Sequence, residues 1–257
     1  MVDLAKQCQM KIRGFKFMGL RCVLNLIDFS QTFIQGVWGT DSSYKQLTFF
    51  QDDDNFRILK KKFFKKAPSL SEIQKNTENP DFKLFNLFDE EKRSQLLQEI
   101  KLIPNMSIEV TTFVKEEEQI MEDDILTLKI KIVRENVPEG EKQQMVHNPK
   151  NPFFRKEKLY IIVGSEENNV VIFFKVVSKR SRVIEEEFQM RAPPPGTYGW
   201  NIFVKSDSYI GVDYTTEVKF TSIPRVERVI KLFFNFSNSL FIQTMRNSIR
   251  NFQSSNK

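Results

Sequence analysis

The chain has 257 residues, 40% of them hydrophobic and 28% charged, with 25 phenylalanines but only 9 glycines. This length and balance indicate a soluble globular protein with room for a sizeable core, in one large domain or two or three small ones. The formal net charge of +6 permits an anionic partner, such as nucleic acid or a lipid surface, without requiring one.

Membrane-spanning, secreted and metal-binding classes are disfavoured. The longest apolar runs, at 159–164 and 170–174, are far below the roughly 18 residues that span a bilayer, and charges interrupt the first residues where a signal peptide needs an apolar stretch. Cys8 and Cys22 are the only cysteines. With no further Cys or His nearby to complete a metal set, they are predicted to be buried, reduced thiols in a cytosolic compartment.

Catalytic motifs are absent. His147 is the only histidine and lies in a loop rich in Pro and Asn, so a Ser–His or Cys–His pair is disfavoured. The sequence contains no HExxH or CxxC metal motif, no GxxxxGK[ST] phosphate loop and no GxGxxG nucleotide motif. We therefore predict a non-enzymatic protein that uses no metal or cofactor and binds no small-molecule substrate.

The first strongly periodic segment is 20–38, where apolar residues recur every three or four positions. This spacing predicts a buried helix that ends where Gly39 opens a turn. The following segment, 44–66, has three acids and then a basic run, and its periodicity is poor. No element is predicted there.

Two short helices joined by a turn are predicted over 69–103. Ser69 precedes Glu72 by three residues, which is the spacing of a capping box. Acids at 89–91 then precede an apolar stripe that ends before Pro104.

After Pro104 the apolar period changes from about 3.6 to 2, the period of half-buried antiparallel strands. Their number and spacing predict a β-sandwich of the immunoglobulin or fibronectin type III kind. The tail then returns to helical spacing and predicts a C-terminal amphipathic helix over 223–257. The seven predicted strands are 107–114, 125–133, 159–164, 170–177, 184–190, 197–205 and 215–222.

A basic run with interleaved aromatics is one candidate binding feature. Its ammonium groups could neutralise an anionic surface while Phe63 and Phe64 stack on bases or enter an interface; alternatively, the two phenylalanines anchor a loop to the core. The acidic runs 115–119 and 184–188 are expected to be solvated surface, because consecutive carboxylates point in different directions. The candidate lysines are Lys60, Lys61, Lys62, Lys65 and Lys66.

The other candidate is the stretch 201–220, which concentrates Ser, Asp and Tyr between two predicted strands. Asp and Ser side chains bond nearby amides where a strand ends, and a glycine permits unusual backbone angles. A structured turn is thus predicted, with Tyr209 and Tyr214 as edge or corner aromatics and the turn as a docking surface. The predicted partner-binding residues are Asp207, Tyr209, Gly211 and Asp213.

The same stretch carries a family resemblance. "SDSYIGVD" at 206–213, with "APPPGTYGWNIFVK" and "VHNPKNPFFRKEKLYIIVG" before it, resembles the Brl module shared by the Sec-sixty-three translocon subunit and the Brr-two type RNA helicases. Upstream, "LIDFSQTFIQGVW" is similar to the module's Leu-Ser-Gln…Gln-x-x-Trp helix. Leu159 and Tyr160 stand where the family has paired tryptophans, and the tail is basic where translocon proteins have acids.

The resemblance covers the chain up to about residue 222 and implies an α+β architecture with a helical bundle portion (1–66), a helix-hairpin-helix-like element (67–104) and a fibronectin type III-like sandwich (105–222). The tail helix (223–257) predicted from the apolar spacing is the fourth part. It also implies a scaffold for post-translational protein translocation. Such a scaffold docks on the protein-conducting channel and companion subunits at the cytosolic face of the endoplasmic reticulum membrane. Because no J-domain motif or span is present, a longer parent chain or partners would place it there.

Two alternatives remain open. A regulatory module attached to a Brr-two type spliceosomal helicase would bind proteins or RNA, and the basic run favours that role. The basic tail could also lie on an anionic membrane surface.

Overall fold

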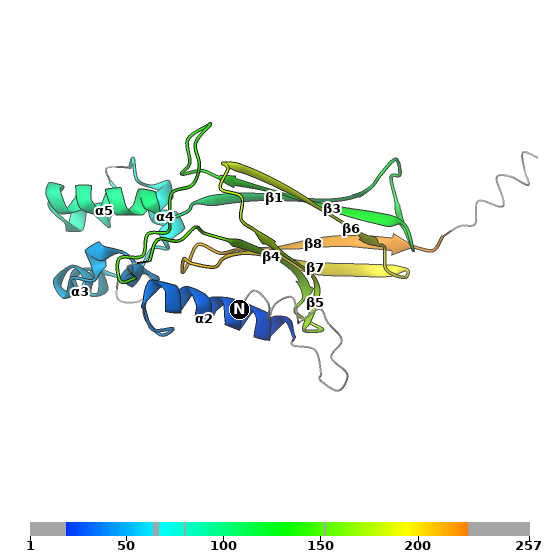
Figure 1. Cartoon of the computed structure of the whole chain (residues 1–257), viewed down its shortest axis with the longest axis horizontal. Coiled ribbons are helices and arrows are strands. Elements are labelled where there is room, and N and C mark those ends of the chain that lie inside the picture. The colour runs from blue at the N-terminus through cyan, green and yellow to red at the C-terminus, as the bar shows by residue number, and fades with distance from the viewer. Residues whose placement is uncertain (1–18, 64–66, 80, 152, 226–257) are drawn as a thin grey trace, which may run out of the picture.

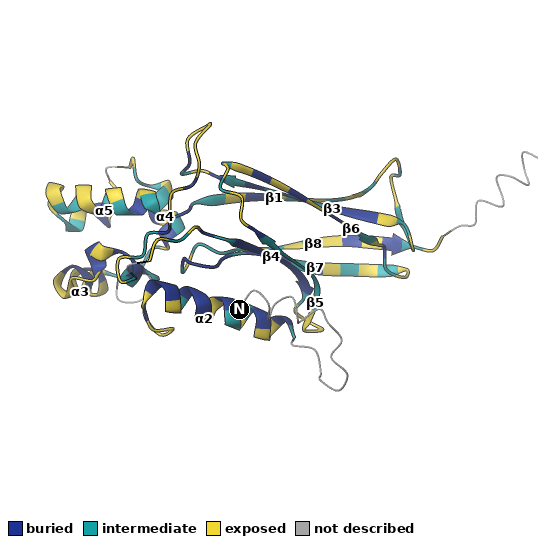
Figure 2. Cartoon of the chain, viewed as in Figure 1, coloured by how far each residue is buried: buried dark blue, intermediate teal, exposed yellow. Residues whose placement is uncertain are grey.

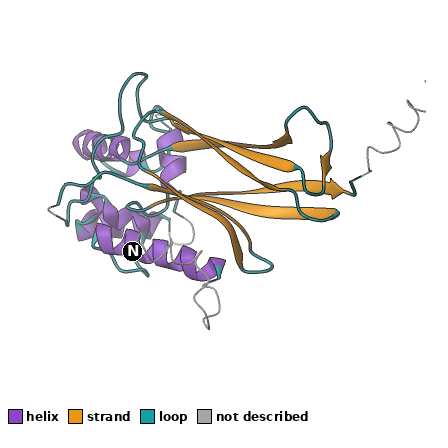
Figure 3. Cartoon of the chain, turned by 45° about the vertical axis from the view of Figure 1, so that its right-hand side comes forward, coloured by secondary structure: helices purple, strands orange, loops and turns teal. Residues whose placement is uncertain are grey.

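The computed structural model describes residues 19–63, 67–79, 81–151 and 153–225. Within these ranges the helices come first and the strands follow, so the predicted α+β composition is confirmed. Figure 1 shows most helices at one end of two stacked sheets, with α2 lying along the side of one sheet. Figure 3 shows the same division from a second direction. The predicted tail helix lies outside the described residues, apart from its first three positions.

Helix α2 spans Leu20–Gln35 and ends earlier than predicted. Gly36 adopts a left-handed conformation (φ 61°), and its backbone N–H bonds back to carbonyls of the last turn. This glycine cap ends the helix three residues before Gly39, so Trp38 stands outside the helix and is exposed. The buried face of α2 packs on a β-sheet, where Leu20, Val23 and Ile27 meet Tyr160, Ile162 and Phe203.

The segment 43–62 contains three elements that were not predicted. Two 3-10 turns, Ser43–Gln46 (η1) and Thr48–Phe50 (η2), lead into helix α3, Asp53–Lys62. Acids occupy the first turn of α3 and lysines the last, an arrangement that the helix dipole favours.

The two short helices predicted over 69–103 are confirmed. Helix α4, Leu70–Lys75, begins at a capping box in which the Ser69 hydroxyl accepts from the Glu72 amide while the Glu72 carboxylate accepts from the Ser69 amide. Helix α5, Glu90–Leu102, begins at Asp89, whose side chain accepts from the Lys92 amide. A 3-10 turn, η3 (Phe85–Leu87), lies between them.

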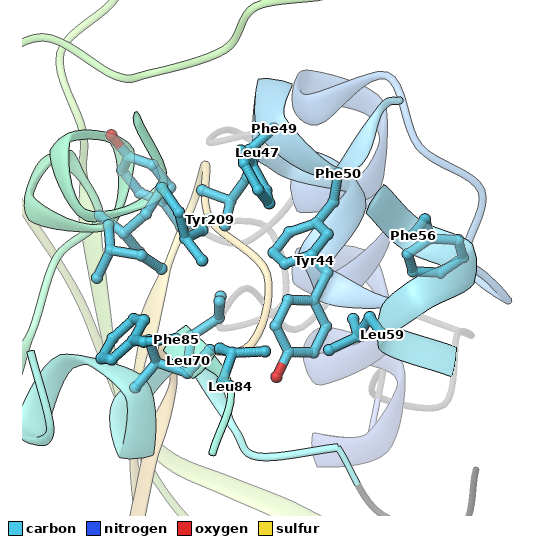
Figure 4. Close-up of a cluster of buried hydrophobic side chains, with 14 of the residues drawn as sticks. Tyr44, Leu47, Phe49, Phe50, Phe56, Leu59, Leu70, Leu84, Phe85 and Tyr209 are labelled. Atoms are coloured by element: carbon cyan, nitrogen blue, oxygen red, sulfur yellow. The ribbon is translucent and has the colours of Figure 1, made fainter. Parts of the chain in front are cut away.

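These helices surround one hydrophobic core, here called the helical cluster. Figure 4 shows its aromatic and aliphatic side chains converging from several elements, with Tyr209 of the strand region among them. The buried members are Ile34, Tyr44, Leu47, Phe49, Phe50, Phe56, Leu59, Leu70, Ile73, Leu84, Phe85, Leu96, Ile100, Ile103, Val146 and Tyr209.

All seven predicted strands are confirmed, and they form two sheets. One has the order β1-β3-β6, and the other has the order β2-β8-β7-β4-β5. Strand β2 was not predicted, because its two residues pair with the distant β8 and carry no pattern of their own. The strands are β1 (Met106–Val114), β2 (Ile120–Met121), β3 (Ile125–Arg134), β4 (Leu159–Ser165), β5 (Val170–Val177), β6 (Val183–Arg191), β7 (Gly196–Ser206) and β8 (Tyr214–Ile223).

The two sheets share a second core between their inner faces. Alternate residues of β3, such as Leu128 and Ile130, meet Ile161 and Val163 of β4 and Ile202 of β7. Helix α2 covers the outer side of β4, β5 and β7. Within the described part of the chain, no helix packs on the outer face of β1, β3 and β6. Figure 2 shows exposed residues alternating with buried ones along these strands.

Two sequence predictions about burial are wrong. Cys22 lies on the exposed side of α2 and is not a buried thiol; Cys8 lies outside the described residues. The acidic run 184–188 is not all solvated, since Glu186 is buried at the edge between the sheets. There Glu186 forms ion pairs with Lys175 and Lys179. These two pairs outweigh burial and lower the pKa of Glu186.

Candidate functional site

A layer of polar side chains closes the end of the sandwich that faces the helical cluster. Arg134 ends β3, and its guanidinium lies 3.2 Å from the Glu157 carboxylate just before β4. The other oxygen of that carboxylate accepts from the Ser206 hydroxyl at the end of β7, at 2.8 Å. All three side chains are essentially inaccessible to water, so we call Arg134, Glu157 and Ser206 the polar layer.

The alternation of inward and outward residues along the strands explains why Arg134 and Glu157 point toward the core. Arg134 continues the inward phase of Leu128 and Ile130, and Glu157 precedes the inward Leu159 by two positions. Since alternate residues share one face of a strand, both charges must point toward the core. The Arg134 guanidinium also donates to the carbonyls of Lys179 and Ser181, which ties the β5–β6 connection to the layer.

The loop 206–213 is folded around its own buried polar atoms. The Ser206 hydroxyl accepts from the amides of Ser208 and Tyr209, which turns the chain as β7 ends. Asp207 accepts from the Lys158 amide at 3.0 Å and pairs with Arg155 at 2.6 Å. A charge-assisted pair and a strand-end amide therefore hold the loop against the segment before β4.

Helix α2 is attached to the same loop by two glutamines. The Gln31 amide group donates to the Ser206 carbonyl at 2.8 Å and to the carboxylate of Asp213. One turn later, the Gln35 amide donates to the Ser208 carbonyl at 2.7 Å and to the His147 carbonyl at 3.2 Å. Side chains four residues apart share a helix face, so both glutamines reach one loop.

Two further contacts attach the loop to the helical cluster. The Gln46 side chain donates to the Ile210 carbonyl at 2.7 Å and accepts from the Ile210 amide at 3.1 Å. The Tyr209 hydroxyl accepts from the His147 amide at 2.8 Å. Gly211 has φ +76°, and a Cβ there would lie 3.2 Å from the Ser43 side chain, so this position favours glycine.

Burial sets the titration of these groups. Burial raises the pKa of Glu157 although Arg134 opposes it, and raises the pKa of Asp213 although Lys205 opposes it. Burial also raises the pKa of the Tyr209 hydroxyl and lowers the pKa of His147. At neutral pH, Tyr209 is protonated and His147 is uncharged.

The structure brings the predicted docking residues together but buries two of them. Asp207 and Tyr209 are 1% and 0% exposed, because α2 and the segment before β4 cover the loop. Their side chains are therefore inaccessible to a partner. Gly211 is at the surface and Asp213 is half-buried, so a docking role for this part of the loop stays a prediction.

The predicted basic surface is only partly described. Lys60, Lys61 and Lys62 are exposed at the end of α3, whereas Lys65 and Lys66 lie outside the described residues. The Lys60 ammonium lies 4.6 Å from the centre of the Phe56 ring. Phe63 packs against the helical cluster, as an anchoring role requires.

The sequence predictions did not include Gln31, Gln35, Gln46, Arg134, Arg155 and Glu157. Gln31 and Gln35 lie inside the quoted "LIDFSQTFIQGVW" motif, and Arg134 and Glu157 stand in the inward phase of their strands, so these four could have been recognised from the sequence. The sequence carries no comparable signal for Gln46. Among the described residues, no group of three His, Cys, Asp or Glu is placed to hold a metal ion, and no helix has the length and apolarity of a membrane span.

The sequence of this chain is similar to those of several known proteins. The relatives found include an activating signal cointegrator 1 complex subunit 3-like protein of Dictyostelium discoideum, 24% identical over 77% of this chain. They also include the U5 small nuclear ribonucleoprotein 200 kDa helicase of Drosophila melanogaster, 24% identical over 76% of this chain. The pre-mRNA-splicing factor brr2 of Schizosaccharomyces pombe is 24% identical over 74% of this chain.

The chain spans only 8–9% of the length of these relatives. Among solved structures, the CARDB domain of the PF1109 protein from Pyrococcus furiosus has a TM-score of 0.31 and 8% identity, over 47% of this chain and 90% of that one. That likeness is too weak to support an argument. The model of the Sec63 Brl domain matches residues 13–219, and the chain therefore belongs to the Sec63 Brl domain family.

Proposed function

We propose that this chain is a non-enzymatic scaffold module that holds other proteins in a larger assembly. The observation that carries the proposal is the use of the buried polar groups. Arg134, Glu157, Ser206 and Asp207 are bonded to structural partners that lock strands, loop and α2 together, which gives a rigid platform rather than a reaction centre. We further assign the two-sheet region to the fibronectin type III-like class, since layers of three and five strands enclose its core.

The assembly proposed first is the protein-conducting channel with its companion subunits, at the cytosolic face of the endoplasmic reticulum membrane. The segments 52–73 ("DDDNFRILKKKFFKKAPSLSEI") and 88–104 ("FDEEKRSQLLQEIKLIP") resemble the translocon type more than the helicases, which supports this choice. The uncovered β1-β3-β6 face would meet the partner. It carries alternating charges held in cross-strand pairs, such as Lys131 to Glu109 at 3.3 Å and Lys129 to Glu185 at 3.0 Å.

The first prediction exchanges one of these pairs. In Glu109→Lys with Lys131→Glu, the residues still face each other across β1 and β3, so stability should change by less than about 1 kcal/mol while the charge pattern reverses. If this face docks, affinity capture of channel subunits from detergent-solubilised microsomes should fall severalfold. Lys219→Glu on β8 is the matched control and should capture normally. Equal capture by wild type and exchange variant would contradict docking through this face.

A helicase-associated role is the second candidate, because the relatives named above include a 200 kDa helicase and a splicing factor. The second prediction tests it with single-stranded RNA. Under this role, wild type should bind RNA more weakly as salt rises, and Lys60→Glu with Lys61→Glu and Lys62→Glu should abolish that binding. These lysines are exposed at the end of α3, so the hydrophobic core should be retained, although three acids there oppose the helix dipole and should weaken the last turn of α3. Capture of channel subunits without RNA binding would favour the translocon; capture of splicing proteins would favour the second candidate.

A further inference from the structure

Five aromatic side chains gather around the C-terminal half of α2, where none of the described residues covers them. They come from three separate parts of the sequence: α2 itself, the turn after it, and the segment before β4. Their exposed fractions lie between 61% and 89%, far above those of the other described aromatics. We call them the aromatic patch: Phe29, Phe33, Trp38, Phe153 and Phe154.

Helix geometry brings these segments to one side. At about 100° per residue, Phe29, Phe33 and Gly36 fall within an arc of about 60° on α2, opposite its buried face. The Phe29 and Phe33 ring centres are 6.4 Å apart. Lys150 packs against Gly36, with its ammonium 3.3 Å from the Gly36 carbonyl, so the part of the loop around Lys150 borders this face.

Hydrogen bonds and an ion pair fix the backbone segments that carry the aromatic patch. The Trp38 amide donates to the Asp41 side chain at 3.2 Å, which tightens the turn after α2. The Phe153 amide donates to the Asn151 side chain at 3.2 Å, and the adjacent Arg155 is anchored by Asp207. The backbones that carry the exposed rings are therefore fixed, although the rings themselves meet water.

Near the patch, two lysines have no carboxylate of the described residues close by, whereas the nearby carboxylates are already paired with other cations. Lys150 and Lys156 are exposed, and no described carboxylate lies within 4.0 Å of either ammonium. The nearby carboxylates already have cations: Asp28 pairs with Lys205 at 2.7 Å, and Asp41 pairs with Lys45 at 3.3 Å. Exposed aromatic rings beside lysines without an ion-pair partner among the described residues match a ligand that has anionic groups above an apolar layer.

We propose that the aromatic patch is a peripheral binding surface for an anionic lipid bilayer. Phenylalanine rings would enter the boundary between headgroups and acyl chains, Trp38 would lie at the headgroup level, and the two lysines would meet lipid phosphates. A bilayer suits these side chains better than a protein ligand, because rings that protrude this far form no groove for a helix or strand. The inference holds for either assembly proposed above.

The third prediction uses Trp38 as a local reporter in the full chain. The only other tryptophan, Trp200, is buried in the sandwich and gives a constant background. Vesicles of phosphatidylcholine with phosphatidylserine should shift the emission to shorter wavelength, and lipids with brominated acyl chains should quench it. Trp38→Phe should lose both signals while still co-sedimenting with the vesicles. Phosphatidylcholine alone should give little response.

Substitutions distinguish lipid binding through the aromatic patch from lipid binding through other parts of the chain. Phe153→Ser with Phe154→Ser should reduce partitioning about tenfold or more, and Lys150→Glu with Lys156→Glu about fivefold for each lysine. Ile125→Ser, at another exposed apolar position on β3, should bind like wild type. Co-sedimentation without a Trp38 signal would place the contact elsewhere, for example at 226–257, and overturn the proposal. Failure to bind the vesicles, with capture of a protein that the Phe153/Phe154 variant loses, would show a protein interface instead.

Discussion

Replacing Arg134 by methionine is expected to lower the free energy of unfolding by roughly 3–5 kcal/mol, because it leaves a buried carboxylate without its cation. The substitution preserves apolar bulk but leaves the Glu157 carboxylate buried with only the Ser206 hydroxyl as partner. It also frees the carbonyls of Lys179 and Ser181. Chemical denaturation monitored by Trp200 fluorescence would measure the loss.

The pH dependence and a double variant identify the cause. Without Arg134, the pKa of Glu157 in the folded state rises further above its unfolded value of about 4.3. A raised folded-state pKa means that stability is retained at low pH and lost as the pH rises through that pKa, so the variant should be closest to wild type under acid conditions. Arg134→Met with Glu157→Gln removes both charges and should recover most of the loss at neutral pH. A deficit that is equal at every pH and persists in the double variant would contradict an unpaired buried carboxylate.

Those two residues also show what the sequence can reveal about the site. The inward phase of β3 and the approach to β4 place one cation and one anion on the core side, and opposite charges in that position point to a buried pair. The strands themselves were predictable for the same reason, since a period of two is a local property. The capping box at Ser69 and Glu72 is local too, and it was predicted correctly.

What could not be predicted depends on contacts between distant segments. Asp207 and Tyr209 have the composition of a surface turn, and their burial depends on Gln31, which reaches the loop from 175 residues away. Helix α3 has only Phe56 and Leu59 as buried apolar residues, so its stripe is too short to show a period. The early end of α2 was missed because a left-handed Gly36 cannot be distinguished from a glycine in a loop by spacing alone.

The loop 206–213 lies between two hydrophobic cores, which explains its density of polar groups. Ser206 belongs to the polar layer at the end of the sandwich, while the Tyr209 ring packs in the helical cluster. Because Ser206 and Tyr209 are only three residues apart, this short stretch of the loop connects the two cores. Because the backbone between them has no apolar core of its own, its amides and carbonyls need partners from side chains, and Gln31, Gln35 and Gln46 supply them.

Replacing Tyr209 by alanine should therefore loosen the helices from the sandwich, at a cost of about 3–5 kcal/mol typical of a buried aromatic ring. Hydrogen exchange should quicken in α4, α5 and the η1–η2 segment, while the central strands β4 and β7 keep their protection. Tyr209→Phe is the matched control: it keeps the ring, leaves the His147 amide without its acceptor, and should cost about 1–3 kcal/mol without uncoupling the parts. If the alanine variant speeds exchange equally in both parts, Tyr209 is an ordinary core residue and the two cores unfold as one unit.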